Sequence, residues 1–368
     1  MSEFQTCKKD LTLVRSVDTD FAQALESLAE GQIVVSIERF AFTANNVTYG
    51  AAGDTIGYWK FFPARDNQDD EWGCLPVWGF AKIEASKVDG LFVGERIYGY
   101  FPPADFLVMH PGKISVPRFV DIVAHRSELP AVYNNYVRLA AEPDYDSSTD
   151  DLRALLNPLH VTSFCLCDAL EDEGYHSADQ IVIVSASSKT AIGLAQGIAD
   201  LPAAPPVVGL TSSANANFVK SLGCYNSVIT YDQLEALDAS LATVMVDMAG
   251  NRALLGQVHG ALGDKLLSCI SVGMTHWETL AEKDPISNQI NRERSHFFFA
   301  PAHIQKRIAD WGQTGFYQRT QSFMRSRMAQ SENWMSVQTV KGFADFSEIY
   351  GDMVSGKISP NEGLIVLP

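Results

Sequence analysis

A phosphate-binding turn is the chemistry that the sequence suggests most clearly. Four β-branched residues, Ile181 to Val184, predict a strand buried on both faces, Ser185 to Thr190 predict a tight turn, and a helical pattern begins at Ala191. A helix that opens directly after a parallel strand points unpaired backbone N–H groups and the positive end of its dipole at the turn, which favours a pyrophosphate. The segment therefore predicts a dinucleotide site, with an ordinary turn between strand and helix as the alternative.

The turn departs from the glycine-rich fingerprint of such sites. Of the glycines in G-x-G-x-x-G only Gly193 remains, and serine or threonine occupies the earlier positions. These residues keep their backbone N–H groups and add hydroxyl donors, but their Cβ atoms restrict left-handed backbone angles and close approach. Gly193 also has a structural interpretation, close packing of the helix on the strand. The cofactor-binding candidates in this segment are Ser187, Ser188, Lys189, Thr190, Ala191, Ile192 and Gly193.

The next strand of the expected nucleotide unit ends without a carboxylate. Its last residues are Thr211, Ser212 and Ser213. An Asp or Glu there would hold the ribose hydroxyls of NAD, and its absence leaves room for the additional phosphate of NADP. NADP is therefore the expected cofactor. Lys189 is a candidate for the positive charge that this phosphate needs, or else an ordinary solvated lysine.

Strand and helix signals divide the chain into three segments. Residues 31–115 are dense in short strand patterns separated by Gly, Pro and acidic turns, which is typical of a small β-barrel, and the polar residues 143–151 predict a hinge or loop. Strands and helices then alternate, which predicts an α/β unit with a doubly wound parallel sheet. The expected units are a barrel at 1–152, the parallel sheet at 153–302, and a helical tail at 303–368 whose last strand returns to the first unit.

Composition limits the possible partners. The chain has 28 Lys and Arg against 44 Asp and Glu, a net charge of −16, which argues against nucleic acid or an anionic membrane as a partner. Six scattered cysteines show no metal-binding spacing, and no window holds the roughly 18 consecutive apolar residues of a membrane span. The N-terminus lacks an apolar signal core. We expect a cytoplasmic protein that acts on a small molecule.

Several short motifs occur in the order and spacing of a known superfamily. They are A-x-x-x-N-x-x-T from Ala41, P-x-x-G from Pro76, G-E-R-I-x-G from Gly94, L-x-V-T-S from Leu159, K-S-L-G from Lys220, Tyr231, and V-D-M-A-G from Val246. From about residue 31 to 368 the chain resembles the medium-chain dehydrogenase/reductase superfamily, in its zinc-free quinone or enone reductase branch, and within it an uncharacterised-function subfamily. The resemblance implies a GroES-like β-barrel followed by a Rossmann domain.

The resemblance adds cofactor-binding residues. Thr162 matches a position beside the nicotinamide, with a helix N-terminal cap as the alternative. Tyr231 matches a contact to the NADP phosphate, or is a tyrosine packed at a strand end. Ser271, Val272 and Gly273 are expected to bring backbone close to the nicotinamide, or to form an ordinary turn at a strand end.

The resemblance also implies a substrate site. Asn45 matches a residue that lines the nicotinamide and substrate cleft between the two lobes, or else serves as a turn former. Tyr49 and Tyr58 carry hydroxyls that could donate to a developing enolate oxygen or supply a proton. Nearby aromatic residues could form the walls for a hydrophobic substrate, or simply pack in the core. They are Trp59, Phe61, Phe62, Trp78 and Phe101.

Zinc is not expected, because Gly79-Phe80-Ala81 stands where zinc-binding relatives have Gly-His-Glu and the structural cysteine loop is missing. The sequence thus predicts an NADPH-dependent, zinc-independent oxidoreductase that reduces an enone or quinone-type acceptor by hydride transfer. A reductase of acyl-thioester enones and a nucleotide-binding module without turnover are the alternatives. The resemblance further implies a homodimer formed by sheet extension at residues 296–299.

Overall fold

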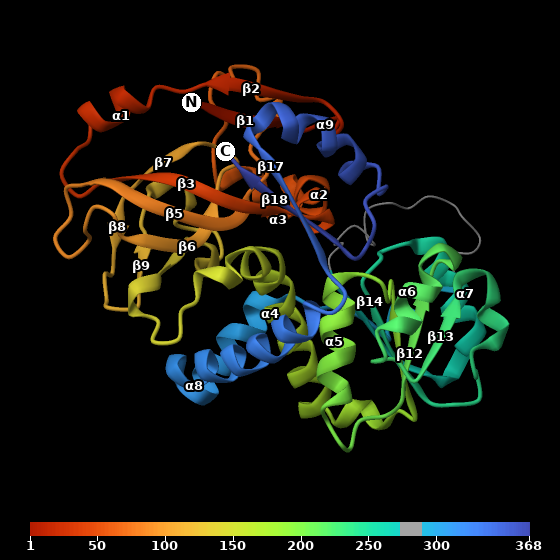
Figure 1. Cartoon of the computed structure of the whole chain (residues 1–368). Coiled ribbons are helices and arrows are strands. Elements are labelled where there is room, and N and C mark those ends of the chain that lie inside the picture. Colours follow the sequence, from red (N-terminus) through yellow and green to blue (C-terminus); the bar gives the residue numbers. More distant parts are fainter. Residues whose placement is uncertain (273–288) are drawn as a thin grey trace. The chain divides into compact units, whose positions relative to one another are not determined.

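The computed structural model describes residues 1–272 and 289–368 and divides the chain into two compact units (Figure 1). Unit 1 comprises Met1–Leu155 and Met335–Pro368, and unit 2 comprises Leu156–Trp334. The first boundary lies close to the expected one at 152. Residues 303–334, which the sequence analysis assigns to the returning tail, instead lie in unit 2, because they form most of a long helix whose side chains pair with the preceding helices of that unit.

Unit 1 is built on a nine-stranded sheet in the order β17-β18-β3-β5-β6-β10-β9-β8, with β7 pairing with β3. The last strand of the chain pairs antiparallel with β3, Val366 opposite Phe40, and so joins the C-terminal segment to this sheet. The strands are β3 (Ile33–Phe42), β5 (Val77–Ser86), β6 (Arg96–Phe101), β7 (Phe106–Met109), β8 (Pro111–Gly112), β9 (Arg118–Asp121), β10 (Asn135–Arg138), β17 (Ser336–Lys341) and β18 (Glu362–Leu367).

Helix α9 (Gly342–Val354) closes the core of unit 1. Its buried residues, Phe343, Phe346, Tyr350 and Met353, recur at helical spacing and so form one apolar stripe. Phe346 packs on Phe4 with ring centroids 4.7 Å apart. The remaining elements are β1 (Ser2–Cys7), β2 (Val14–Asp18), β4 (Trp72–Gly73), α1 (Phe21–Glu26), α2 (Ala44–Ala51), α3 (Gly53–Ile56) and the short 3-10 helices η1 (Tyr58–Lys60), η2 (Ala124–Arg126), η3 (Ala131–Asn134), η4 (Leu139–Ala141) and η5 (Ser147–Thr149).

Unit 2 contains a six-stranded parallel sheet in the order β13-β12-β11-β14-β15-β16. Counted from β11, the strands lie in the order 3-2-1-4-5-6 of a doubly wound dinucleotide-binding sheet, so the expected fold class is confirmed. Every residue of β11, β12 and β14 is buried, as in a parallel sheet covered on both faces. The strands are β11 (Gln180–Val184), β12 (Val207–Thr211), β13 (Ser227–Thr230), β14 (Thr243–Asp247), β15 (Leu266–Ser271) and β16 (Ser295–Phe297).

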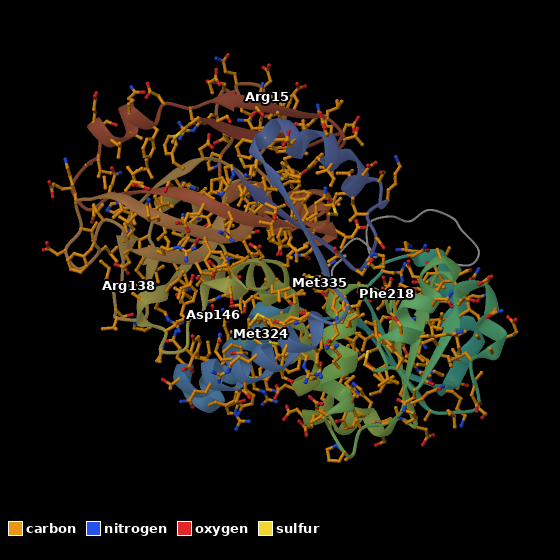
Figure 2. All side chains as sticks on the ribbon, in the orientation of Figure 1. Arg15, Arg138, Asp146, Phe218, Met324 and Met335 are labelled. Atoms are coloured by element: carbon orange, nitrogen blue, oxygen red, sulfur yellow. The ribbon has the colours of Figure 1, made fainter. Side chains whose placement is uncertain are left out.

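Two long helices frame this sheet in the sequence, α4 (Asp150–Asp172) and α8 (Ala300–Ser331). Helix α8 is interrupted at Gly312, whose φ of 71° is left-handed. Figure 2 labels Met324 on α8 and Met335 at the start of the returning segment. No helix in the described ranges has both the length and the apolar character to cross a membrane. The other helices are α5 (Lys189–Ala199), α6 (Ala216–Ser221), α7 (Arg252–Leu262), η6 (Gly174–Ser177), η7 (Ser213–Asn215), η8 (Tyr231–Ala236) and η9 (Gly263–Lys265).

Candidate functional site

The turn between β11 and α5 lies where the strand order of unit 2 reverses. The chain runs outward from β11 to β12 and β13, then crosses back to β14 on the other side of β11. In open α/β sheets, ligands bind at the carboxyl ends of the strands beside such a reversal. The expected phosphate-binding turn therefore occupies the position in the sheet where a nucleotide diphosphate binds.

Serine side chains shape this turn. Ser185 adopts φ 60°, a left-handed conformation that is uncommon outside glycine. Ser188 caps α5, and its Oγ accepts a hydrogen bond from the Ala191 amide at 3.3 Å. The helix consequently begins at Lys189, two residues before Ala191, where the sequence pattern places its start. Capping also means that one of the amides at the helix N-terminus is already bonded within the chain.

Neighbouring segments hold the turn in place. Asn215 donates to Ser187 Oγ at 3.1 Å, and the Tyr225 hydroxyl donates to the Ala186 carbonyl at 2.8 Å. The Tyr231 hydroxyl interacts with Ser185; burial raises the pKa of this tyrosine, and the hydrogen bonds to Ser185 oppose the shift. The turn is therefore fixed before any ligand binds.

Gly193 allows α5 to approach another helix closely. A Cβ atom at this position would lie 2.6 Å from His160 Cδ2 and 2.8 Å from Ser163 Oγ, both on α4. Ser163 Oγ also donates to the Thr190 carbonyl at 2.7 Å. The expected role of Gly193, packing of helix on strand, is therefore corrected to packing of helix on helix.

His160 is a buried neutral group behind the turn. Burial, reinforced by the Arg327 cation, lowers the pKa of His160 to about 3. The imidazole is therefore uncharged near neutral pH and contributes no positive charge to a phosphate. Thr162 lies inside α4 and its hydroxyl donates to the Pro158 carbonyl at 3.3 Å, so the interpretation of Thr162 as a helix N-terminal cap is wrong.

The carboxylate of Asp232, which the sequence did not indicate, lies beside the residues that follow β12. β12 and β13 run parallel with Thr211 opposite Thr230, so the residues that follow each strand lie side by side. Ser213 donates to Asp232 Oδ1 at 3.1 Å. Hydrogen bonds from Thr230, from its own amide and from Ser213 lower the pKa of Asp232, so its carboxylate is charged. No signal in the separate strand patterns indicates this juxtaposition, which depends on strand pairing.

Thr211 is the least satisfied polar group at this edge. Its side chain is 1% exposed, and Oγ1 has no hydrogen-bond partner among the described residues. A buried hydroxyl without a partner is costly, and a bound ligand or water usually satisfies it. Ser212, the adjacent residue, is half-buried and precedes η7.

A surface hollow of about 560 Å³ adjoins this region. Its lining includes Tyr231, Asp232 and Glu235, together with Gln257 and Gly260 of α7. Two of these five residues, Asp232 and Glu235, carry carboxylates, which oppose a phosphate group by charge repulsion.

On the other side of the reversal, Asp247 ends β14 and folds the backbone that follows. Its carboxylate is 1% exposed and accepts hydrogen bonds from the amides of Ala249, at 2.9 Å, and Gly250. Burial raises the pKa of Asp247. Ser271 pairs with Asp247 in the sheet, and the Val272 amide donates to the Asp247 carbonyl at 2.8 Å. These residues share one edge, while Gly273 lies outside the described residues.

The structure thus collects most of the expected cofactor-binding residues at one edge of the unit 2 sheet. Ser187 and Ser188 form the turn, the next five residues form the first turns of α5, and the ends of the neighbouring strands complete the edge. The residues on α5 are Lys189, Thr190, Ala191, Ile192 and Gly193. The strand-end residues are Thr211, Ser212, Ser213, Tyr231, Ser271 and Val272.

The expected catalytic residues come together in unit 1. Asn45 and Tyr49 lie one helical turn apart on α2, and the Tyr49 and Tyr58 rings stack with centroids 4.3 Å apart. Asn45 is in the first turn of a helix capped by Thr43, so its interpretation as a turn former is wrong. Burial is the main cause that raises the pKa of both tyrosines, so both are neutral phenols near neutral pH.

Two further tyrosines, which the sequence analysis missed, complete this group. The rings of Tyr100 and Tyr133 pack at a tilt, with centroids 4.8 Å apart and planes 36° apart. Tyr133 contacts Tyr58, and Tyr100 contacts Tyr49. We call Tyr49, Tyr58, Tyr100 and Tyr133 the tyrosine cluster. Its members come from α2, η1, β6 and η3, so their meeting could not be read from sequence spacing.

Within residues 1–272 and 289–368, no three His, Cys, Asp or Glu side chains are placed to hold one metal ion. Phe80, at the position where zinc-binding relatives have histidine, is fully buried in β5.

Residues 40–359 match the model of a family described as "Protein of unknown function (DUF2855)". The chain belongs to this family. No curated protein matches the sequence of this chain.

Solved structures define its fold. CurA from Vibrio vulnificus in complex with NADPH is 14% identical, with a TM-score of 0.63, over 100% of this chain and 99% of that one. The yhdH oxidoreductase from Salmonella enterica in complex with NADP is 14% identical, with a TM-score of 0.54, over 100% of both chains. A quinone oxidoreductase from Pseudomonas syringae pv. tomato DC3000 is 14% identical, with a TM-score of 0.56, over 100% and 99%. The DUF2855 chain therefore has the medium-chain dehydrogenase/reductase fold, a GroES-like lobe with a Rossmann domain.

Proposed function

We propose that this DUF2855 protein is an NADPH-dependent, zinc-independent oxidoreductase that reduces an enone or quinone-type acceptor by hydride transfer. The observation that carries the proposal is the strand order of unit 2, with the serine-shaped turn at the point of reversal. A helix N-terminus at that point favours a diphosphate without any metal ion. Two of the similar structures, CurA and the yhdH oxidoreductase, contain NADPH or NADP, and a third is a quinone oxidoreductase, which supports this assignment.

The residues present fit a dinucleotide at the edge of the sheet. The turn before α5 would hold the diphosphate, and the unpartnered Thr211 hydroxyl would gain a partner from the adjacent ribose. Ser271 and Val272 would offer backbone to the nicotinamide end. Reduced nicotinamide supplies the hydride when it is bound, and the protein supplies orientation and electrostatics.

The cofactor preference depends on two opposing features. β12 ends without a carboxylate of its own, which leaves room for the NADP phosphate. Asp232, hydrogen-bonded to Ser213 beside that strand end, repels the same phosphate. We infer that NADPH binds, with Tyr231 as a phosphate contact, but with a smaller preference over NADH than a cationic residue at this place would give.

The test is a fluorescence titration of the purified chain with NADPH and NADH, followed by a panel of quinones, enones and an enoyl thioester with absorbance of NADPH as the readout. Binding of NADPH and its oxidation by a quinone or enone support the proposal. Oxidation by the thioester alone would move the assignment to a reductase of acyl-thioester enones. Absence of binding to either nucleotide would overturn the proposal.

A second candidate is a nucleotide-binding module without turnover. Two observations favour it: Ser188 already caps one amide of the helix N-terminus, and Asp232 places a negative charge near the expected phosphate. NADPH binding without oxidation by any acceptor of the panel would select this candidate.

We also propose that two copies associate through β16. This strand pairs with β15 alone among the described strands, so its other edge can extend the sheet into a second copy. Sedimentation at several concentrations tests this, with proline replacing Phe297 in β16 as the disrupting variant. A monomeric wild-type chain would contradict it.

A further inference from the structure

Two turns of unit 1 expose apolar side chains that its core does not use. Residues 87–95 join β5 to β6, and residues 113–117 join β8 to β9. Their large apolar residues are exposed, Phe92 by 68%, Val93 by 66%, Ile114 by 37% and Val116 by 76%. We call these four residues the apolar tips. Single exposed apolar residues are ordinary, whereas a group of them bordered by polar residues marks an interaction surface.

The first turn has a fixed shape. The Leu91 side chain is buried in the core of unit 1 and anchors the turn. The Phe92 carbonyl accepts a hydrogen bond from the Glu95 amide at 3.1 Å. Gly94 has φ 87°, and a Cβ atom added to it would meet nothing within 4 Å, so the turn projects from the rest of the unit there. Phe92 and Val93 therefore form a fixed apolar projection.

Arg138 joins the two turns, and Figure 2 labels it. Its guanidinium donates to the Gly90 carbonyl at 2.8 Å in the first turn and to the Ser115 carbonyl at 3.0 Å in the second. It also pairs with the Glu95 carboxylate at 3.0 Å. Because one side chain bonds both turns, the apolar tips lie on one surface of unit 1.

The charge of this surface is opposite in sign to that of the whole chain. The two turns, the adjoining Arg118 and Arg138 carry four cationic and two anionic side chains, an excess of two positive charges in a chain of net charge −16. At physiological ionic strength a charge is screened over about 8 Å, so a surface that meets the apolar tips interacts mainly with the charges beside them. The cations are Lys87, Lys113, Arg118 and Arg138, and the anions are Asp89 and Glu95.

The apolar tips lie at the end of the unit 1 sheet that is remote from α2. Ser86, the last residue of β5, pairs with Ile33, the first residue of β3. Helix α2 begins after the opposite end of β3, beyond Phe42. A large partner at the apolar tips would therefore leave the tyrosine cluster uncovered.

We propose that the apolar tips are a peripheral docking surface for a membrane that contains anionic phospholipid. The apolar side chains would enter the interfacial layer, and Lys113, exposed beside Ile114, would meet the phosphate groups. Projecting turns suit a deformable lipid surface, whereas a folded partner would need a matching hollow. A symmetric contact between two copies would bring two positive surfaces together. The net charge of the chain argues against such a membrane in general, and the local excess of positive charge makes this surface the exception.

Sedimentation with sucrose-loaded vesicles tests this docking surface, and it needs no nucleotide. Wild-type chain should bind vesicles of phosphatidylcholine and phosphatidylserine, mixed at about two to one, more tightly than vesicles of phosphatidylcholine alone. Phe92→Ser should weaken binding at least about tenfold, because one large apolar side chain no longer enters the lipid. Lys113→Gln should weaken it about fivefold, the effect of one cation beside an anionic surface.

Two control variants change the same residue types elsewhere. Leu13→Ser removes an exposed apolar side chain before β2, and Lys357→Gln removes an exposed lysine after α9. Both should bind vesicles as the wild type does, and all four variants should keep its thermal midpoint, since each change lies at the surface.

Wild-type chain that stays in the supernatant with the mixed vesicles would overturn the inference, and so would equal binding by Phe92→Ser and Leu13→Ser. Equal binding by Lys113→Gln and Lys357→Gln would contradict the role of the local charge. If Phe92→Ser alters the sedimentation coefficient without vesicles, a second copy covers the apolar tips and the membrane assignment is wrong. None of these outcomes bears on NADPH binding or oxidation, so the proposed function stands or falls separately.

Discussion

The turn of unit 2 and the tyrosine cluster of unit 1 use hydroxyl groups in opposite ways. In the turn the serine hydroxyls are bonded within the chain: Ser188 caps α5, Ser187 accepts from Asn215, and Ser185 interacts with Tyr231. In the cluster the Tyr100 hydroxyl is buried and unbonded. The turn therefore presents backbone to a ligand, whereas the cluster presents side chains.

This difference indicates how each site should respond to change. A backbone site depends on helix packing and turn shape, so substitutions behind it should act through geometry. A side-chain site depends on individual donors and on the scaffold that orients them. The two sites should therefore be separable: damage to one should leave ligand binding at the other intact.

The largest effect is expected from Arg126→Met, which removes the buried cation that braces the tyrosine cluster through Tyr136. Asp121, 1% exposed, would lose its ionic partner, and breaking a buried pair on one side costs about 3–5 kcal/mol. Chemical denaturation should show this loss, and NADPH binding by the remaining folded protein should not change. Lys357→Met, at an exposed ion pair with Asp352, is the control and should cost about 1 kcal/mol or less. If Arg126→Met lowers the free energy of unfolding by less than about 1 kcal/mol, Arg126 does not brace the tyrosine cluster.

A pH effect is expected behind the turn. The pKa of His160 is about 3 in the folded chain and 6.5 in the unfolded chain, so its stabilising contribution is complete above about pH 6.5 and is lost as the pH falls towards 3. Between about pH 6 and pH 4 the free energy of unfolding should fall by about 2 kcal/mol through this histidine. Denaturation of His160→Gln should show a flatter pH dependence than wild type, with part of the slope kept by His259, whose pKa burial lowers to about 4.

An unchanged slope in His160→Gln would show that this imidazole is not held neutral in the fold.

Gly193→Ala should damage the turn from behind. The new Cβ would need the space occupied by His160 Cδ2 and Ser163 Oγ, and overpacking of this kind costs about 1–3 kcal/mol. Displacement of α5 should weaken NADPH binding. Gly351→Ala, an exposed helical glycine with no atom within 4 Å of its added Cβ, should instead stabilise the chain by about 0.5–1 kcal/mol. Equal NADPH affinity in Gly193→Ala and wild type would argue against the turn as the diphosphate site.

The smallest effect is expected in front of the turn, at Asp232. Asp232→Asn removes a charge beside Ser213 and should strengthen NADPH binding about threefold at low salt, with little effect on NADH. Fluorescence titrations at two salt concentrations measure this. Asp238→Asn is the matched control, since Asp238 also accepts from a serine hydroxyl, at 2.6 Å, and its carbonyl accepts from Gln180 at the opposite end of β11. Equal gains in both variants would point to net charge rather than position.

Much of the architecture could be predicted from local patterns. The β-branched runs of β11, β12 and β14 are buried along their whole length, and alternation of such runs with helices indicates a parallel sheet. The turn before α5 was also predictable, because strand, turn and helix are adjacent in sequence. Sites built from one segment are visible in that segment.

What could not be predicted depends on contacts between distant segments. Asp232 meets Ser213 only because β12 and β13 pair in register, and Gly193 faces His160 only because α4 packs on α5. Thr162 matched a short motif, yet the motif lies within a long helix that continues from Asp150. The tyrosine cluster joins four elements, and a single aromatic residue in a strand or helix gives no signal that distinguishes a site from a core.

A crystal structure of the chain with NADPH tests the central claim most directly. We predict that the diphosphate lies against the backbone of the turn before α5, that the adenosine ribose lies near the Thr211 hydroxyl, and that the NADP phosphate lies beside Ser213. A nucleotide bound elsewhere in the chain, or a turn that keeps its own hydrogen bonds and excludes the diphosphate at saturating NADPH, would contradict it.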